Sequence, residues 1–507
     1  MSKLATSIWY GRAHNEEDVH TPHFLPILGW TAFLLLLTAL RLSLPFVENP
    51  ILEIHTQVLN SLMSGQIWGR QALVSSMEYP PLTTLALFFA KTIADLLQFP
   101  PGHVLVAIAQ IWGLFYLLRI PRGWLARVYT GFAMALILTV NQEARSIFYL
   151  VDPNWVVVIP AACAIYHFVF WCRWQSLRDV VLLGINCGLL IFAGTTGCSL
   201  VLILLLLVSY RIRSLGKLRT APAETCGTRL LLWVPAVYTF GLMFIGNWLI
   251  MHNGLFFVRR FYQAFAAGTE VSILHSIGAE LTNISWLILG SIALCFLKLN
   301  QPKRRTIAIG LGGSLITLVI MVSLLKSMKL YTPGGQILIF LLALGGILMP
   351  LWEIKQDSKL TPRLLVEIII IGVLVAAGAL VPRPGVKSLA LKMETAPHRA
   401  EVLAAADKYT PETRIMTYGF RTPAHYPDLD EKRFLPRVDF NEKTLRWRAQ
   451  TEDFLYVLLP PSDGTFYGKS STLADLHENG RPWLVLEQSW PGGWQLWRVL
   501  NPKAAKA

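Results

Sequence analysis

The chain has 507 residues, of which 54% are hydrophobic and only 15% charged, and its mean hydropathy is +0.48. This composition excludes a soluble globular protein, because a soluble core cannot absorb so much apolar surface, and it predicts an integral membrane protein. Residues 388–507 hold 16 of the 45 Lys and Arg and 15 of the 31 Asp and Glu, so nearly all of the net charge of +14 belongs to the preceding part. Such an excess is typical of loops on the cytoplasmic side of a membrane, and it indicates topology, not a nucleic-acid partner.

Apolar runs near the length that crosses a bilayer, about 20 residues, recur between residues 24 and 381. The polar segment before them (1–23) has no short apolar core with a cleavage site, so the run at 24–44 is predicted to be a retained helix. After residue 387 the composition is that of a soluble protein. The sequence therefore predicts an all-α polytopic membrane domain (1–387) and a small C-terminal α/β soluble domain (388–507).

One apolar run, residues 82–98, is predicted to lie along the membrane surface instead of crossing it. It contains Lys91 and Asp95, and each charged side chain would cost about 2.5–3.5 kcal/mol at the centre of a bilayer. Eleven crossings then remain, and the loops rich in Arg and Lys fall on the cytoplasmic side. This topology predicts a bacterial inner-membrane protein with a cytoplasmic N-terminus and a periplasmic C-terminal domain.

The first predicted outer segment is ENPILEIHTQVLNSLMSGQIW (48–68). Its apolar residues have helical spacing, which predicts an amphipathic helix along the membrane with Glu53 and His55 near its start. These two side chains are candidates for chemistry at the outer face. Glu53 also has a purely structural interpretation, since a carboxylate is favourable near the positive end of a helix.

The stretch MEYPPLTTLALFFA (77–90) places Glu78, Tyr79 and two prolines before the predicted surface helix. Proline begins a helix well because its missing N–H would have no partner there. Glu78 and Tyr79 are therefore expected to stay at the water boundary, beside a cavity near the outer leaflet.

The second outer segment, NQEARSIFYLVDPNW (141–155), contains Glu143, Arg145 and Asp152. The planar donor fork of Arg145 suits a phosphate, and simple contact with lipid headgroups is the alternative interpretation. Asp152 is a candidate catalytic carboxylate. Because Asp before Pro153 is also a good helix N-cap, a structural role alone could explain it.

The third outer segment, residues 251–283, is long, and loops above about 12–15 residues are uncommon without a function. It contains the adjacent Arg259 and Arg260 and then His275. Cations beside carboxylates at one membrane depth suit a substrate with an anionic headgroup and an apolar tail. Scattered side chains that reach from the bilayer to the interface are the alternative.

The C-terminal part is predicted to alternate helices and strands, with a loop at 421–440. Helices are expected at 398–409 and at 470–480, the second ending at Gly480. The strands are expected at 413–420, 453–460, 483–489 and 494–500. This domain contains none of the usual nucleotide-binding or catalytic motifs, so we interpret it as a binding or scaffolding module.

Glu53, the motif EYPPL (78–82) and Asp152 in ARSIFYLVDP (144–153) follow one another in a fixed order. In this order they resemble the GT-C superfamily of polyprenyl-phosphate-dependent glycosyltransferases, particularly the branch of protein O-mannosyltransferases and bacterial aminoarabinose transferase. The resemblance covers residues 24–172 and is only architectural beyond them. The family's usual Asp-Glu pair is here Glu53 alone, and a lysine often found later is replaced around GTTGCSL (194–200), which leaves the sugar and the base open.

The resemblance implies transfer of one sugar, with inversion, from a polyprenyl-phosphate carrier to a glycan, lipid or protein acceptor at the outer face. It implies a carboxylate base, Glu53 first and Asp152 second. No cofactor is required, and a divalent metal is possible but not indicated by any cluster of ligands. The residues implied to bind the substrate are His55, Glu78, Tyr79, Arg145, Arg259, Arg260 and His275.

Two other functions fit a membrane protein of this composition. A transporter of lipid-linked saccharides would place charged residues within its spans and often shows internal repeats. This sequence keeps most of its ionisable residues in the predicted loops and shows no detectable repeat. A polysaccharide polymerase or ligase would share the lipid substrate and a large outer loop, but it would not specially require the PPL motif.

Overall fold

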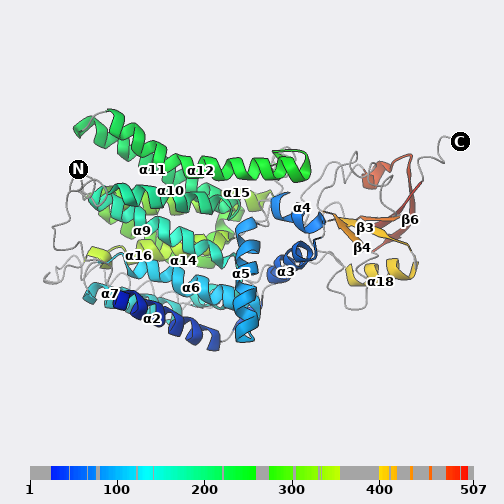
Figure 1. Ribbon diagram of the computed structural model, residues 1–507, viewed down its shortest axis with the longest axis horizontal. Helices are drawn as coiled ribbons and strands as arrows, with labels where there is room; N and C mark the ends of the chain where they lie inside the picture. Colours follow the sequence, from blue (N-terminus) through cyan, green and yellow to red (C-terminus); the bar gives the residue numbers. More distant parts are fainter. Residues whose placement is uncertain are drawn as a thin grey trace.

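The computed structural model of the chain (Figure 1) describes two parts. The first is residues 24–353, apart from 45, 49, 66, 76–79, 122–123, 141, 220–221, 259–272, 301–303, 329–331 and 333. The second is residues 399–409, 413–418, 434–437, 456–459, 476–491 and 493–500.

The first part is a bundle of apolar helices whose axes are roughly parallel to one another (Figure 1). The bundle helices are α2 (Phe24–Ser43), α6 (Pro101–Leu118), α7 (Trp124–Val140), α9 (Val158–Trp174), α10 (Leu177–Ile191), α11 (Thr195–Arg219), α12 (Pro222–Met251), α14 (Ile273–Lys298), α15 (Arg305–Ser327) and α16 (Gly335–Leu348). By length and composition, five helices among the described residues can cross a membrane, and four shorter apolar ones accompany them. The chain is thus a polytopic membrane protein, as predicted. The count of eleven crossings stays a prediction, because the apolar run at 364–381 lies outside the described residues.

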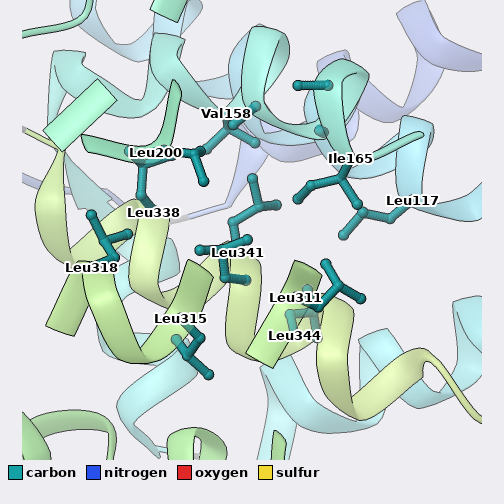
Figure 2. Close-up of a cluster of buried hydrophobic side chains, with 14 of the residues drawn as sticks. Leu117, Val158, Ile165, Leu200, Leu311, Leu315, Leu318, Leu338, Leu341 and Leu344 are labelled. Carbon is teal, nitrogen blue, oxygen red and sulfur yellow. The ribbon is translucent and has the colours of Figure 1, made fainter. Parts of the chain in front are cut away.

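The core of the bundle is centred on α16. All of its residues except Gln336 are buried, as expected for a helix that is apolar on every side. Leucines of α16 meet side chains from α6, α9, α11 and α15 in one cluster (Figure 2). The cluster in Figure 2 includes Leu117, Val158, Ile165, Leu200, Leu311, Leu315, Leu318, Leu338, Leu341 and Leu344. This core fixes the helix ends from which the predicted outer segments extend.

Helix α5 (Pro81–Leu97) lies across one end of the bundle instead of along it (Figure 1). It buries one face, which includes Leu87 and Ala94, and exposes apolar side chains such as Phe89 on the other. Helices α3 (Pro50–Met63) and α4 (Ile67–Ser75) lie at the same end. This arrangement agrees with the predicted surface helices, and α5 is not among the helices that qualify as spans.

The C-terminal part is a five-stranded mixed sheet with α18 (Arg399–Tyr409) packed on it. The strand order is β4-β3-β5-β7-β6, in which β3 pairs parallel with β4 and β5, whereas β7 pairs antiparallel with β5 and β6. In Figure 1 the sheet lies at the end of the bundle where α3, α4 and α5 lie. The strands are β3 (Ile415–Tyr418), β4 (Phe434–Arg437), β5 (Tyr456–Leu459), β6 (Leu484–Trp490) and β7 (Trp494–Val499).

Strand β4 corrects the prediction of a loop over 421–440. It contains Pro436, which argues against a strand in sequence because proline cannot donate a hydrogen bond to its neighbour. The proline is tolerated because β4 is an edge strand and pairs with a neighbour on one side only. The other predicted strands agree, and the predicted helix stop at Gly480 is confirmed by its left-handed backbone, with φ of +59°.

The sheet and the turn between α9 and α10 lie at opposite ends of the bundle (Figure 1). Labelling of single cysteines can test this placement. In a background in which the exposed Cys226 is changed to Ser, we would introduce Val485→Cys in β6 and Arg178→Cys in α10, both exposed positions. We expect a membrane-impermeant maleimide to label Val485→Cys in intact cells and Arg178→Cys only after the membrane is opened. Labelling of both from the same side would contradict the fold and the predicted topology.

Candidate active site

Two of the predicted outer segments, which are far apart in the sequence, meet at the α5 end of the bundle. Strand β1 (Val47–Glu48) pairs parallel with β2 (Leu150–Val151), with Glu48 opposite Val151. The first turn of α3, which contains Glu53, follows β1 closely, and Asp152 follows β2 directly. The backbone therefore brings together the two segments in which the sequence predicts catalytic carboxylates.

Asp152 is the N-cap of the short 3₁₀ helix η2 (Pro153–Val157). Its carboxylate accepts a hydrogen bond from the Asn154 N–H at 2.8 Å, and Pro153 occupies the first helical position, so the predicted capping role is confirmed. The residue is only 6% exposed. Burial raises the pKa of Asp152 from 3.8 to about 6, although the hydrogen bonds from Asn154 act in the opposite direction. At neutral pH the group is mainly ionised, yet it is a stronger base than an ordinary carboxylate.

The start of α5 holds both outer segments through two adjacent threonines. The Thr83 hydroxyl donates to the Asn154 side-chain oxygen at 3.0 Å, which connects α5 to η2. The Thr84 hydroxyl lies 3.2 Å from Nδ1 of His55, which connects α5 to α3. Because Asn154 is adjacent to the Asp152–Pro153 pair, any shift of α5 would move the buried carboxyl.

His55 is fully buried against this part of α5. Burial lowers the pKa of His55 to about 3, so its imidazole is neutral at physiological pH. It therefore cannot supply a positive charge to a phosphate. In this structure His55 links α3 to α5.

A buried arginine lies behind this arrangement. Arg41, in the last turn of α2, is 2% exposed. Its Nε donates to Oε1 of Gln110 at 2.7 Å, and its Nη2 donates to the Phe148 carbonyl at 3.0 Å. Gln110 also donates to this carbonyl, at 2.6 Å. The guanidinium carbon lies 4.0 Å from the ring centroid of Phe46 and 4.8 Å from that of Phe148, so aromatic faces share in holding the charge.

Arg41 has no carboxylate partner among the described residues, and its Nη1 has no hydrogen-bond partner there. A buried charge in this position costs free energy unless every contact to it is well placed. Phe148 lies two residues before β2, so the shared carbonyl fixes the strand that leads to Asp152. Arg41 and Gln110 thus position the candidate site from the interior of the bundle.

The structure places the other predicted site residues as follows. Arg145 is exposed on α8 (Gln142–Tyr149) and makes no ion pair among the described residues. Glu53 lies on α3 and His275 on α14, but their side chains are outside the described set. No group of three or more metal-binding side chains occurs within the described ranges. Glu78, Tyr79, Arg259 and Arg260 lie outside the described residues.

Sequence reasoning missed Arg41, Gln110, Thr83, Thr84 and Asn154. Arg41 had a usable signal, because an ionisable residue within an apolar run is costly and suggests a function by default. The threonines and Asn154 had none, since uncharged polar residues are ordinary near helix ends.

The fold and this end of the bundle define a polytopic membrane protein with a buried carboxyl beside surface helices and an extramembrane domain. No protein-family model matches the chain, and no curated protein matches its sequence. Among solved structures, the fold is similar to ArnT from Cupriavidus metallidurans bound to undecaprenyl phosphate, at 13% identity and a TM-score of 0.48 over 93% of this chain and 97% of that one. It is also similar to the arabinofuranosyltransferase AftD from Mycobacteria, at 14% identity and a TM-score of 0.40 over 95% of this chain and 40% of that one. Both likenesses are distant.

The contacts of Arg41 predict an order of stabilities. Gln110→Leu leaves a buried guanidinium with one acceptor fewer and should destabilise by roughly 3–5 kcal/mol, whereas Arg41→Met strands only the Gln110 oxygen, at about 1–3 kcal/mol. The double variant removes both groups and should unfold at a higher temperature than Gln110→Leu alone. Thermal unfolding of the detergent-solubilised protein measures this. Simple addition of the two losses would show that the two side chains do not act together.

The burial of Asp152 predicts a stability that depends on pH. Its folded pKa of about 6 exceeds the ordinary 3.8, so its contribution to stability is complete below 3.8 and is lost as pH rises through 6. Asp152→Asn cannot ionise but can still accept from the Asn154 N–H, so we expect its Tm to exceed that of the wild type at pH 7–8. The exposed Asp95→Asn is the matched control. A Tm difference that does not change between pH 4 and 8 would argue against the raised pKa.

Proposed function

We propose that the chain is a membrane glycosyltransferase that moves one sugar from a polyprenyl-phosphate carrier to an acceptor at the outer face, with inversion. The observation that carries this proposal is the β1–β2 pairing. It joins the strand that leads into α3, the helix that carries Glu53, to the strand that leads into Asp152, at the end of the bundle where α5 lies across the helices.

The order of sequence motifs supports the same function. Glu53, the PPL motif that opens α5 and Asp152 are the three features on which the resemblance to the GT-C superfamily rests. In the structure all three belong to elements at one end of the bundle. Motifs that meet in space although they are dispersed in sequence are expected of a site and not of independent structural devices.

The proposed chemistry needs a carboxylate that takes the proton of an acceptor hydroxyl. A positioned base of this kind accelerates a reaction by about 10²- to 10⁴-fold. Glu53 is our first candidate for the base and Asp152 our second, the latter as base or as the group that orients the acceptor. A pKa of about 6 suits Asp152 to either role, because the group is ionised at neutral pH and still basic.

The departing group would be the lipid phosphate, whose charge cations must stabilise. Arg145 is exposed and free to turn toward a phosphate, and Arg259, Arg260 and His275 remain candidates from the third outer segment. Glu78 and Tyr79 would line the pocket and hold sugar hydroxyls. Since the phosphate already activates the sugar, the transfer needs no metal. The acceptor would be a glycan, a lipid or a protein, and the site would face the periplasm.

This function predicts that one variant loses sugar transfer and that a second loses the dependence of transfer on acidic pH. In reconstituted membranes supplied with envelope lipid extract, we expect Glu53→Gln to lower sugar transfer by at least about 100-fold while donor binding persists. Wild-type activity should fall as pH drops through about 6, and Asp152→Asn should lose this acidic limb. Mass spectrometry of the carrier and the product is the measurement, and the exposed Arg70→Gln on α4 is the control.

The outcome separates the alternatives. Cells without the protein should accumulate a polyprenyl-phosphate sugar, which would name the donor. Retained activity in Glu53→Gln would remove this residue as the base. A polymeric product would indicate a polymerase or ligase instead, and movement of the lipid-linked saccharide without transfer would indicate a transporter.

A further inference from the structure

A second concentration of charged side chains lies at the opposite end of the bundle. Helices α6 and α9 run side by side in the same direction, with Gly113 packed on Val158 and Nη1 of Arg173 donating to the Ile120 carbonyl at 3.0 Å. Helix α9 starts just after the candidate site, and its 17 residues rise about 25 Å. The loops after α6 and α9 therefore lie about one bilayer core away from Asp152.

Aromatic rings hold two arginines at this end. The Arg119 guanidinium lies 5.5 Å from the ring centroid of Tyr166 and 5.9 Å from that of Phe115. The Arg173 guanidinium lies 5.9 Å from the ring of Phe170, which stacks on Tyr166 with centroids 4.4 Å apart. Two cations thus share one aromatic platform, an arrangement that limits their motion without neutralising their charge.

Two further arginines surround the platform. Arg127, at the start of α7, donates from Nε to the Pro121 carbonyl at 3.3 Å, and Arg178 lies in the first turn of α10. Arg119, Arg127 and Arg178 are all exposed, and each acts electrostatically on the Tyr166 hydroxyl. The four charges therefore converge on one region.

The acidic group in this region is already engaged. Asp179 lies 2.9 Å from Nδ1 of His167, and both side chains are largely buried. Within the described part of the chain, Arg119, Arg127 and Arg178 form no salt bridge. Among the described residues, these three arginines therefore carry positive charges that no carboxylate pairs.

We propose that this arginine–aromatic cluster (Arg119, Arg127, Arg173 and Arg178) binds the phosphodiester headgroup of an anionic membrane phospholipid. Guanidinium groups match phosphate oxygens with two parallel hydrogen bonds. Basic pockets between membrane helices on the cytoplasmic side suit such headgroups, and the predicted topology places this end on that side. The site is separate from the proposed transferase site and does not depend on it.

The neighbouring surface of α7 indicates a lipid as the source of the phosphate. Beside Arg127, this helix exposes Val128, Tyr129 and Phe132, the last at 67%. A headgroup held at the cluster would lay its acyl chains along this apolar face. A free phosphate ion would gain nothing from that surface.

Native mass spectrometry of the full-length protein tests the proposal by titration with dioleoyl phosphatidylglycerol. The variant Arg119→Gln/Arg178→Gln changes two exposed residues, so the fold should persist, and thermal unfolding checks this. Loss of two cations near a lipid headgroup predicts roughly 25-fold weaker binding. Arg70→Gln, an exposed arginine at the other end, is the matched control and should bind within about 2-fold of the wild type, by the same electrostatic reasoning.

The proposal would be overturned by unchanged binding in a folded double variant, by an equal loss in Arg70→Gln, by equal binding of dioleoyl phosphatidylcholine, or by displacement of the lipid by phosphate. Inorganic phosphate distinguishes the two sources of the ligand. Competition by millimolar phosphate that empties the cluster would assign it to a free anion. Persistence of the bound lipid in that phosphate supports the membrane phospholipid.

Discussion

The candidate site depends on one buried cation. Arg41 lies inside an apolar bundle, where a charge is tolerated only if its surroundings supply compensation. Here an amide oxygen, a backbone carbonyl and two aromatic rings do so, and no carboxylate takes part among the described residues. Gln110 and Arg41 both donate to the Phe148 carbonyl, so the strand that precedes Asp152 is held from the interior. The predicted outer segment that contains Asp152 is therefore held in place although it has little regular secondary structure.

The second constraint is the position of α5 across the end of the bundle. Its first turn uses two neighbouring hydroxyls, Thr83 and Thr84, to hold η2 and α3 at once. The same packing removes Asp152 and His55 from water, which raises the pKa of the carboxyl and lowers that of the imidazole. Burial thus leaves an ionised carboxyl at Asp152 and a neutral imidazole at His55 at physiological pH.

The two ends of the bundle have opposite chemistry. A buried carboxyl lies at the end with α5 and the C-terminal sheet, whereas arginines gather around aromatic rings at the other end. Three of these arginines, Arg119, Arg127 and Arg178, are exposed and form no salt bridge among the described residues. This polarity agrees with the positive-inside rule and with a site at the outer face. In the function we propose, the apolar bundle between them separates the reaction from the leaflet in which the arginines are anchored.

The sequence alone determined the membrane class, the two-part organisation, the surface helix at 82–98 and the capping role of Asp152. These features are set by composition or by residues a few positions apart, so they need no knowledge of the fold. Only the tertiary structure decided that Arg41 meets Gln110, that His55 meets Thr84 and that β4 forms an edge strand despite Pro436. Each of these depends on which distant segments become neighbours, and the free energy of burying a polar group is defined only once its partners are in place.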